Sequence, residues 1–171
     1  MKDFAVVMLR RVRPLVIAGG IAVLMVMAGA FDQASWAQGA RQIYSDTANA
    51  HYDIASAIKT AKAEHKRVIV DFGGNWCGDC QVLDIYLHQQ PNLALLDKNF
   101  VLVHVDIGQY DRNMDIIDKY EIPIHNGVPL LMVLNGQGTV LYMQKHKEFE
   151  KMQMVTPQSV AEFLNQWKPR G

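Results

Sequence analysis

The chain has 171 residues, of which 50% are hydrophobic and 20% charged, and its 17 basic and 17 acidic side chains give a formal net charge of zero. This balance excludes a strongly basic nucleic-acid-binding protein, and the apolar fraction excludes a disordered chain. We expect one compact domain that binds no nucleic acid.

The N-terminal 37 residues have the pattern of a secretory signal peptide. Basic residues precede a charge-free apolar stretch over residues 15–30, and Ser35 and Ala37 supply the small side chains expected before a cleavage site. We predict a signal peptide over residues 1–37 and one exported, periplasmic domain over residues 38–171. The alternative is an uncleaved signal anchor that tethers the protein to the membrane, although the apolar stretch is shorter than the ~20 residues that usually span a bilayer.

The elements expected after this leader alternate between helix and strand. In chain order they are a helix over 45–65 with Ser45 or Asp46 as N-cap, a strand over 68–72, a helix from 82 closed by Pro91, a helical turn at 93–98, a strand over 100–106, a helix over 111–120, a hairpin of strands 130–134 and 139–142, and a helix that begins at Thr156-Pro157. This order predicts an α/β fold in three layers, with a central mixed β-sheet flanked by helices. Residues 143–155 fit a longer strand, a loop or a lid.

Both cysteines of the chain lie in one motif, Cys77-Gly-Asp-Cys80, which directly follows the first strand. Two intervening residues allow a disulfide on the first turn of a helix, where free N–H groups and partial positive charge favour a thiolate at Cys77. Cys77 is therefore the predicted nucleophile. Cys80, turned inward by the helix, is the predicted resolving cysteine that attacks the mixed disulfide.

Two carboxylates are placed to influence this pair. Asp71 lies within the apolar strand, where an ionised side chain is costly to bury, so we predict that it relays a proton to or from Cys80. The alternative is a strand-end residue that faces solvent. Asp79 lies between the cysteines, where its charge opposes a thiolate at Cys77 but stabilises the first helical turn, and it is a predicted tuner of the redox potential.

The chain resembles the thioredoxin superfamily over about residues 45–168. Val70-Asp71-Phe72 followed by Trp76-Cys77-Gly78-Asp79-Cys80 is similar to the family's strand and active-site turn, and Gly127-Val128-Pro129 is similar to its cis-proline loop. The resemblance implies a thioredoxin fold and a redox-active Cys77–Cys80 disulfide. It also implies a cis bond before Pro129 and a substrate-binding surface made of Trp76, Val128 and Pro129.

Within the superfamily, the chain is most similar to the C-terminal domain of the disulfide interchange protein DsbD and its single-domain relatives. Two features depart from the common thioredoxin pattern. Asp79 replaces a proline, and the loop before the cis-proline is longer and carries His125. His125 is either a solvated loop residue or a group that tunes the thiolate.

The predicted function is that of an exported thiol:disulfide oxidoreductase that needs no cofactor and acts as a monomer. We expect it to receive electrons from a membrane donor and to reduce the disulfides of exported proteins. One alternative is an oxidant that forms disulfides with the same motif. Another is a copper chaperone that binds Cu(I) through Cys77, Cys80 and His125. The remaining histidines have no ligand spacing and are assigned no role.

Overall fold

The computed structural model describes residues 41–145, 149 and 154–170. The predicted leader over residues 1–37 and most of the segment over residues 143–155 lie outside this part of the chain. Among the described residues, no helix combines the length and the apolar character needed to cross a membrane.

A mixed sheet forms the centre of the domain, with four strands in the order β2-β1-β3-β4. The two inner strands are β1 (Arg67–Gly73) and β3 (Leu130–Leu134), and the two outer strands are β2 (Phe100–Asp106) and β4 (Val140–Met143). Strand β1 pairs in parallel with β2 and antiparallel with β3, and β3 is antiparallel to β4. Both inner strands are almost completely buried, which explains why their sequences are apolar runs rather than alternating patterns.

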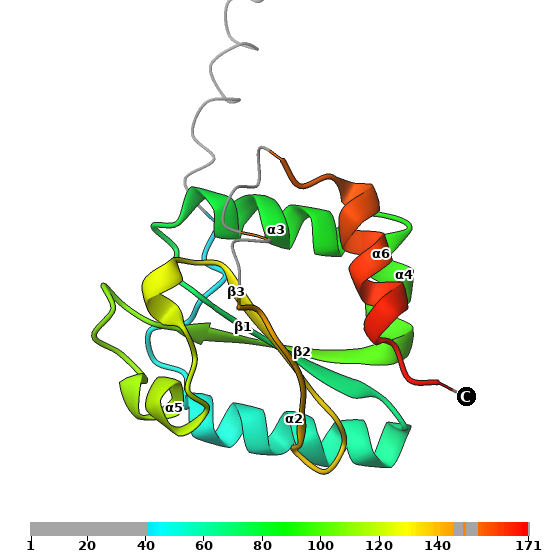
Figure 1. The fold of residues 1–171 in the computed structure, drawn as a ribbon, viewed down its shortest axis with the longest axis horizontal. Coiled ribbons are helices and arrows are strands. Elements are labelled where there is room, and N and C mark those ends of the chain that lie inside the picture. The colour runs from blue at the N-terminus through cyan, green and yellow to red at the C-terminus, as the bar shows by residue number, and fades with distance from the viewer. Residues whose placement is uncertain (1–40, 146–148, 150–153, 171) are drawn as a thin grey trace, which may run out of the picture. The chain divides into compact units, whose positions relative to one another are not determined.

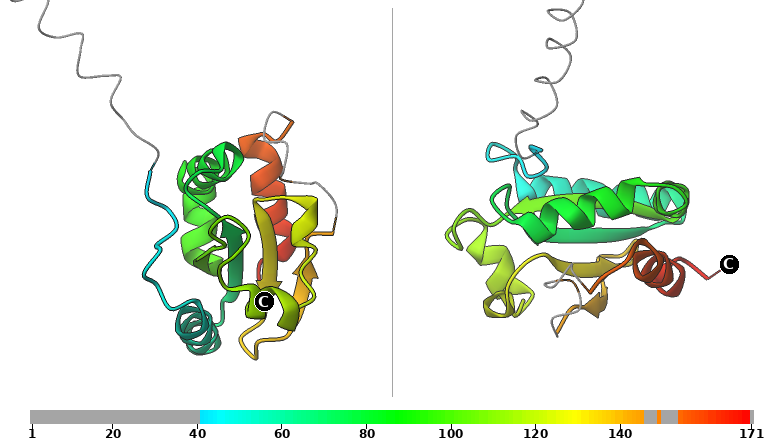
Figure 2. Two further views of the ribbon diagram at one scale, coloured as in Figure 1. Left: turned by 90° about the vertical axis from the view of Figure 1, so that its left-hand side faces the viewer. Right: turned by 90° about the horizontal axis from the view of Figure 1, so that it is seen from above.

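Helices cover both faces of the sheet (Figures 1 and 2). On one face lie α2 (Ala50–Glu64) and α5 (Met114–Lys119). On the other face lie α3 (Gly78–His88), α4 (Asn92–Asn99) and α6 (Pro157–Trp167). The three-layer arrangement predicted from the sequence is confirmed.

Two apolar cores fill the spaces between these layers. Side chains alternate along β1, so Val68, Val70 and Phe72 join the core beneath α2, whereas Ile69 joins the core beneath α3, α4 and α6. The alternation also puts Asp71 on the same side of the strand as Ile69. The buried carboxyl group therefore faces the layer that carries the two cysteines.

Several predicted boundaries differ from the structure by a few residues. Helix α2 begins at Ala50 rather than at Ser45, because Asn49 caps it by accepting a hydrogen bond from the backbone N–H of Tyr52 at 3.0 Å. Helix α5 begins at Met114 because Asn113 has a left-handed backbone with φ 53°, and β4 covers Val140–Met143. The predicted start of α6 is confirmed, with Thr156 and Ser159 in a reciprocal capping box.

Candidate active site

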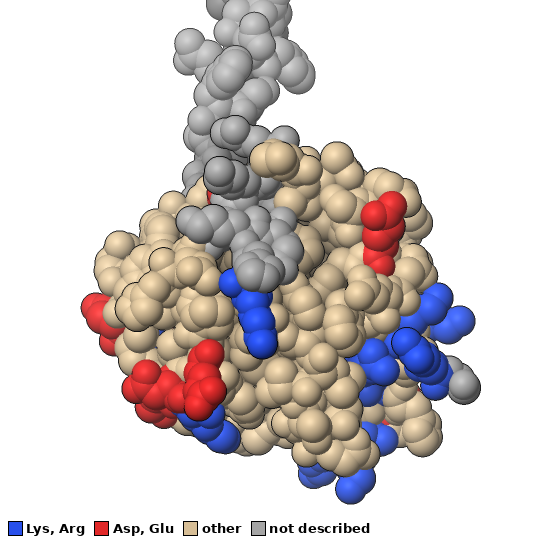
Figure 3. All heavy atoms as spheres, viewed as in Figure 1, with Lys and Arg blue, Asp and Glu red and all other residues tan. Residues whose placement is uncertain are grey.

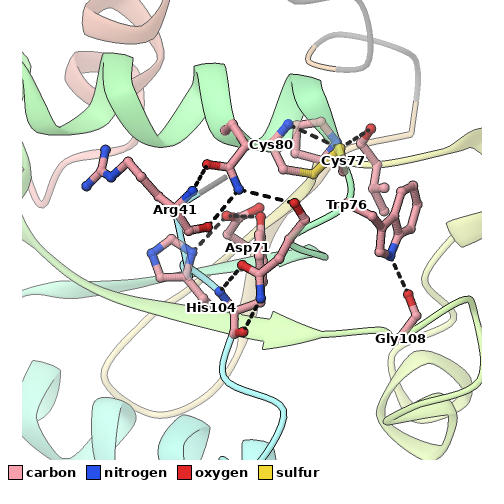
Figure 4. The surroundings of a disulfide bond; sticks show 12 residues. Arg41, Asp71, Trp76, Cys77, Cys80, His104 and Gly108 are labelled. Carbon is pink, nitrogen blue, oxygen red and sulfur yellow. Dashed lines mark hydrogen bonds and ion pairs between the residues drawn. A yellow bond between two sulfur atoms is a disulfide. The ribbon is translucent and has the colours of Figure 1, made fainter. Parts of the chain in front are cut away.

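The two cysteines form a disulfide at the N-terminus of α3 (Figure 4). Cys77 is the N-cap of the helix, and its Sγ accepts a hydrogen bond from the backbone N–H of Cys80 at 3.1 Å. Cys77 is 6% exposed, whereas Cys80 is fully buried. An incoming disulfide can therefore reach the sulfur of Cys77 but not that of Cys80.

The loop before β3 approaches the disulfide from the other side. Its Val128–Pro129 peptide bond is cis, and the Val128 carbonyl oxygen lies 3.6 Å from Cys77 Sγ. A disulfide sulfur carries no hydrogen, so this contact becomes a hydrogen bond only when Cys77 is a thiol. Gly127 has φ 109°, a conformation that favours glycine and that turns the chain from the short 3₁₀ helix η1 (Ile124–Asn126) into this loop.

Trp76 forms the outer wall of the site. Its side chain is 47% exposed, and its Nε1–H donates to the backbone carbonyl of Gly108 at 2.6 Å. Its ring also lies against Tyr110, with 5.8 Å between the ring centroids. Trp76 is thus held in place and still presents apolar surface next to Cys77.

Asp71 is fully buried, so the alternative of a solvent-facing strand-end residue is wrong. One carboxylate oxygen, Oδ2, accepts two hydrogen bonds: one from the Tyr44 hydroxyl at 2.7 Å and one from the Nδ1–H of His104 at 2.9 Å. The other oxygen, Oδ1, is buried and has no hydrogen-bond partner among the described residues. Figure 4 shows Asp71 and His104 on the sheet, beside the helix that carries Cys80.

A second buried carboxylate, Asp84, lies one turn after Cys80 on α3. The guanidinium of Arg41 is 2.7 Å from its Oδ2, and Nδ1 of His88 is 3.0 Å from its Oδ1. His104 lies between the two carboxylates, because its Nε2 is 3.9 Å from Oδ1 of Asp84. A polar cluster therefore extends from the sheet to the surface of α3.

This cluster changes the proton affinity of two of its members. Burial raises the pKa of Tyr44 well above its ordinary value, and the charge and hydrogen bond of Asp71 raise it further. Burial by itself would lower the pKa of His104, but the hydrogen bond and charge of Asp71, together with the charge of Asp84, outweigh burial and raise it. Tyr44 consequently remains a hydrogen-bond donor, and His104 holds a proton more readily than an exposed histidine.

Sequence reasoning missed the partners of Asp71 and assigned His104 no role. The signal for His104 was available, because it is the fifth residue of β2 as Asp71 is the fifth residue of β1, and parallel pairing in register sets them side by side. The signal for Asp84 was its position four residues after Cys80, between the buried Leu83 and Leu87. Tyr44 gave no signal, since it precedes the first helix and belongs to no periodic pattern.

The two predicted tuning residues, Asp79 and His125, do not belong to this cluster. Asp79 occupies the first turn of α3 and is partly exposed, and His125 is exposed on η1. Among the described residues, no group of three or more His, Cys, Asp or Glu side chains is arranged to hold a metal ion. The ligand set of the copper alternative, Cys77, Cys80 and His125, is therefore not assembled.

Comparison with known proteins agrees with this geometry. Residues 48–136 match the family model described as thioredoxin-like. The chain belongs to the thioredoxin-like family. A disulphide isomerase from Xylella fastidiosa is 34% identical, with a TM-score of 0.70 over 74% of this chain and 96% of that one. The predicted thioredoxin fold and the family's enzyme class, thiol:disulfide oxidoreductase, are thereby confirmed.

The predicted similarity to DsbD is also confirmed. The thiol:disulfide interchange protein DsbD of Colwellia psychrerythraea is 26% identical over 55% of this chain, and the match spans only 15% of that longer protein. The C-terminal domain of DsbD from Neisseria meningitidis shares the fold, with a TM-score of 0.50 and 22% identity over 70% of this chain and 96% of that domain.

Proposed function

We propose that this protein is an exported thiol:disulfide oxidoreductase that reduces disulfide bonds in other proteins. The observation that carries the proposal is the unequal setting of the two sulfurs. Cys77 keeps a small exposed area and its Sγ faces the cis-proline loop, while Cys80 is fully buried. In this arrangement Cys77 exchanges with substrates and Cys80 closes the intramolecular disulfide, and the reduction potential of the pair sets the direction.

The reaction begins with the reduced protein. The Cys77 thiolate, favoured by the N-terminus of α3, attacks one sulfur of the substrate disulfide and forms a mixed disulfide, and the other substrate sulfur leaves and takes up a proton. The Cys80 thiol then gives its proton to Asp71 and attacks Cys77 Sγ. The substrate's second sulfur leaves and is protonated in turn. The substrate has gained two electrons and two protons, and the Cys77–Cys80 disulfide is restored.

Substrate recognition in this proposal depends mainly on the backbone. The cis-proline loop offers the carbonyl of Val128 beside the reacting sulfur, and Trp76 adds exposed apolar surface. An extended substrate segment can add to such an edge through main-chain hydrogen bonds, which makes few demands on its sequence. We therefore propose a monomer that accepts many exported proteins and regains its electrons from a dithiol of a membrane protein.

The direction of electron flow is tested by the reduction potential of the Cys77–Cys80 couple in dithiothreitol or glutathione buffers. A value near the ~−270 mV of thioredoxin supports a reductase, whereas a value near the ~−120 mV of strong oxidants reverses the proposal in favour of disulfide formation. Failure of the pair to cycle would contradict both directions.

A second candidate, disulfide isomerisation, has one observation in its favour, the name of the Xylella fastidiosa relative. Isomerisation needs Cys77 to open a wrong disulfide, after which a thiol of the substrate itself resolves the mixed species. Cys80→Ser separates the two activities. We expect it to abolish net reduction of a protein disulfide, while the refolding of a scrambled disulfide protein is retained only if isomerisation is the main activity. Cys77→Ser is the control that removes both.

A further inference from the structure

The segment that follows the predicted leader is fastened to the active site. The Asn75 side chain, directly before the Trp76-Cys77 turn, accepts hydrogen bonds from the backbone N–H groups of Ile43 at 2.8 Å and Tyr44 at 3.0 Å. Its amide nitrogen donates to the Tyr44 carbonyl at 2.6 Å. The Gln81 side chain of α3 binds both backbone groups of Arg41, at 3.1 Å and 2.9 Å.

These hydrogen bonds position the Tyr44 side chain in the space behind the disulfide. Tyr44 is 1% exposed, and its ring packs edge-on against His104 with 5.3 Å between centroids. A Cβ atom added at Gly73 would collide with the Tyr44 hydroxyl and would lie 2.8 Å from Cys80 Sγ. The hydroxyl and the buried sulfur therefore border the same point of β1. Asp71, two residues earlier, faces the same side of that strand.

The two oxygens of Asp71 are consequently unequal. Tyr44 and His104 both donate to Oδ2, while Oδ1 is buried without a partner among the described residues. A buried polar atom without a hydrogen bond is costly and rare, and it marks a place where a proton or a ligand is expected during function. In the reduced protein the Cys80 thiol is a donor on this side of the strand.

We propose that Tyr44 is a positioning residue for the proton transfer between Cys80 and Asp71. Together with His104 it fixes Oδ2, so that Oδ1 is the oxygen that takes the proton when Cys80 attacks. In that step the S–H bond of Cys80 breaks, an O–H bond forms at Oδ1, and the thiolate attacks Cys77 Sγ and expels the substrate sulfur. This inference rests on the proposed function, because it concerns the resolving half of thiol–disulfide exchange.

The hydroxyl of Tyr44 acts on the carboxylate and does not itself exchange the proton. Burial and the charge of Asp71 raise the pKa of Tyr44, so it stays protonated and donates throughout the cycle. The other charged groups around Asp71 are His104 on β2 and Asp84 on α3, and Arg41 and His88 in turn hold Asp84. A hydrogen bond to the ionised carboxyl favours that form, so removal of the hydroxyl leaves a smaller fraction of Asp71 ionised and ready to take the proton of Cys80.

The test follows the reduced protein with 5,5′-dithiobis(2-nitrobenzoic acid) by stopped flow. Attack by Cys77 releases one coloured thiolate at a rate proportional to the reagent concentration. Attack by Cys80 then releases the second thiolate at a rate that does not depend on that concentration. The two phases report separately on Cys77 and on Cys80, and each is measured as a function of pH.

We expect Tyr44→Phe to slow the second phase about tenfold near neutral pH, as loss of one hydrogen bond to a charged group predicts. The pH at which the second phase reaches half its maximal rate should move upward, and the first phase should change less than about twofold. Tyr52→Phe, on the 71%-exposed tyrosine of α2, is the matched control and should leave both phases unchanged. Asn75→Ala, which releases the segment without touching Asp71, should slow the second phase in the same direction.

The outcomes separate this inference from the proposed function. If the wild-type protein shows no first phase, thiol–disulfide exchange itself fails. If both wild-type phases are present, but Tyr44→Phe lowers only the melting temperature and leaves the rate and pH profile of the second phase intact, Tyr44 is a packing residue and the inference is overturned. Should Tyr44→Phe not fold, an unchanged second phase in Asn75→Ala overturns it equally.

Discussion

At the scale of single residues, the site contains a carboxylate that is removed from water and is stabilised by hydrogen bonds from the protein instead. Asp71 is fully buried, and an isolated charge there would cost several kcal/mol, which the Tyr44 and His104 donors offset in part. Both donors bind Oδ2, so Oδ1 remains free to accept a proton. A fully satisfied aspartate would be more stable and less able to accept a proton.

His104 makes the stability of the folded domain depend on pH, and its neighbours determine the sign of this dependence. Folding raises the pKa of His104, so its contribution to stability is complete below the unfolded pKa of about 6.5 and is lost as the pH rises through the folded value. We expect His104→Gln to lower the free energy of unfolding of the oxidised protein more at about pH 5.5 than at about pH 9. Urea denaturation at the two pH values measures the difference.

The control for this prediction is His51→Gln. His51 pairs with Asp115 across an exposed surface, with side chains 57% and 66% accessible, and such pairs contribute little. Its loss should change stability only slightly at either pH. Equal losses for His104→Gln at both pH values would show that proton uptake by His104 is not coupled to folding.

At the scale of elements, Gly73 at the end of β1 and Gly78 at the start of α3 differ in how much room each leaves for a side chain. A Cβ at Gly73 would collide with Tyr44 and press on Cys80, whereas a Cβ at Gly78 would meet nothing within 4 Å. We expect Gly73→Ala to lower the free energy of unfolding by about 1–3 kcal/mol, the usual cost of overpacking. Gly78→Ala, at the first position of the helix, should be neutral or slightly stabilising. Equal urea midpoints for the two variants would contradict this reading of the site.

Sequence patterns predicted those elements whose local chemistry and tertiary packing agree. This agreement holds for the apolar run of β1, for the C-x-x-C motif at a helix start and for the Thr156 cap of α6. The start of α2 was predicted too early because Ser45, Asp46 and Asn49 are all able to cap a helix. The structure uses Asn49, after a bend at Tyr44 and a turn at residues 46–47. The polar cluster around Asp71 was only half predictable, because its members come from four segments that only the folded chain brings together.

At the scale of the whole molecule, the N-terminal segment is part of the domain rather than a linker to it. Arg41 and Tyr44 both hold buried carboxylates, and Tyr44 is almost completely inaccessible. We expect a chain that starts at residue 41 to unfold with the same free energy as one that starts at residue 38. A chain that starts at residue 46 should lose at least about 3 kcal/mol, because the buried surface of Tyr44 and the hydrogen bonds of residues 41–44 are lost. Calorimetry of the three chains checks this, and equal stabilities would contradict it.

The outer surface supports a partner recognised by shape rather than by charge. On the face shown in Figure 3, most of the surface carries neither basic nor acidic side chains. This distribution fits a protein that binds substrates of varied composition through a main-chain edge.

The polar cluster behind the disulfide has a consequence for the pH that suits this domain. As carboxylates, Asp71 and Asp84 carry two negative charges, and Arg41 supplies one positive charge beside them. Protonation of His104, the histidine that contacts both carboxylates, offsets the remaining negative charge. Mild acid therefore brings the interior of this domain closer to charge balance. Its interior is thus better matched to mildly acidic than to alkaline solution.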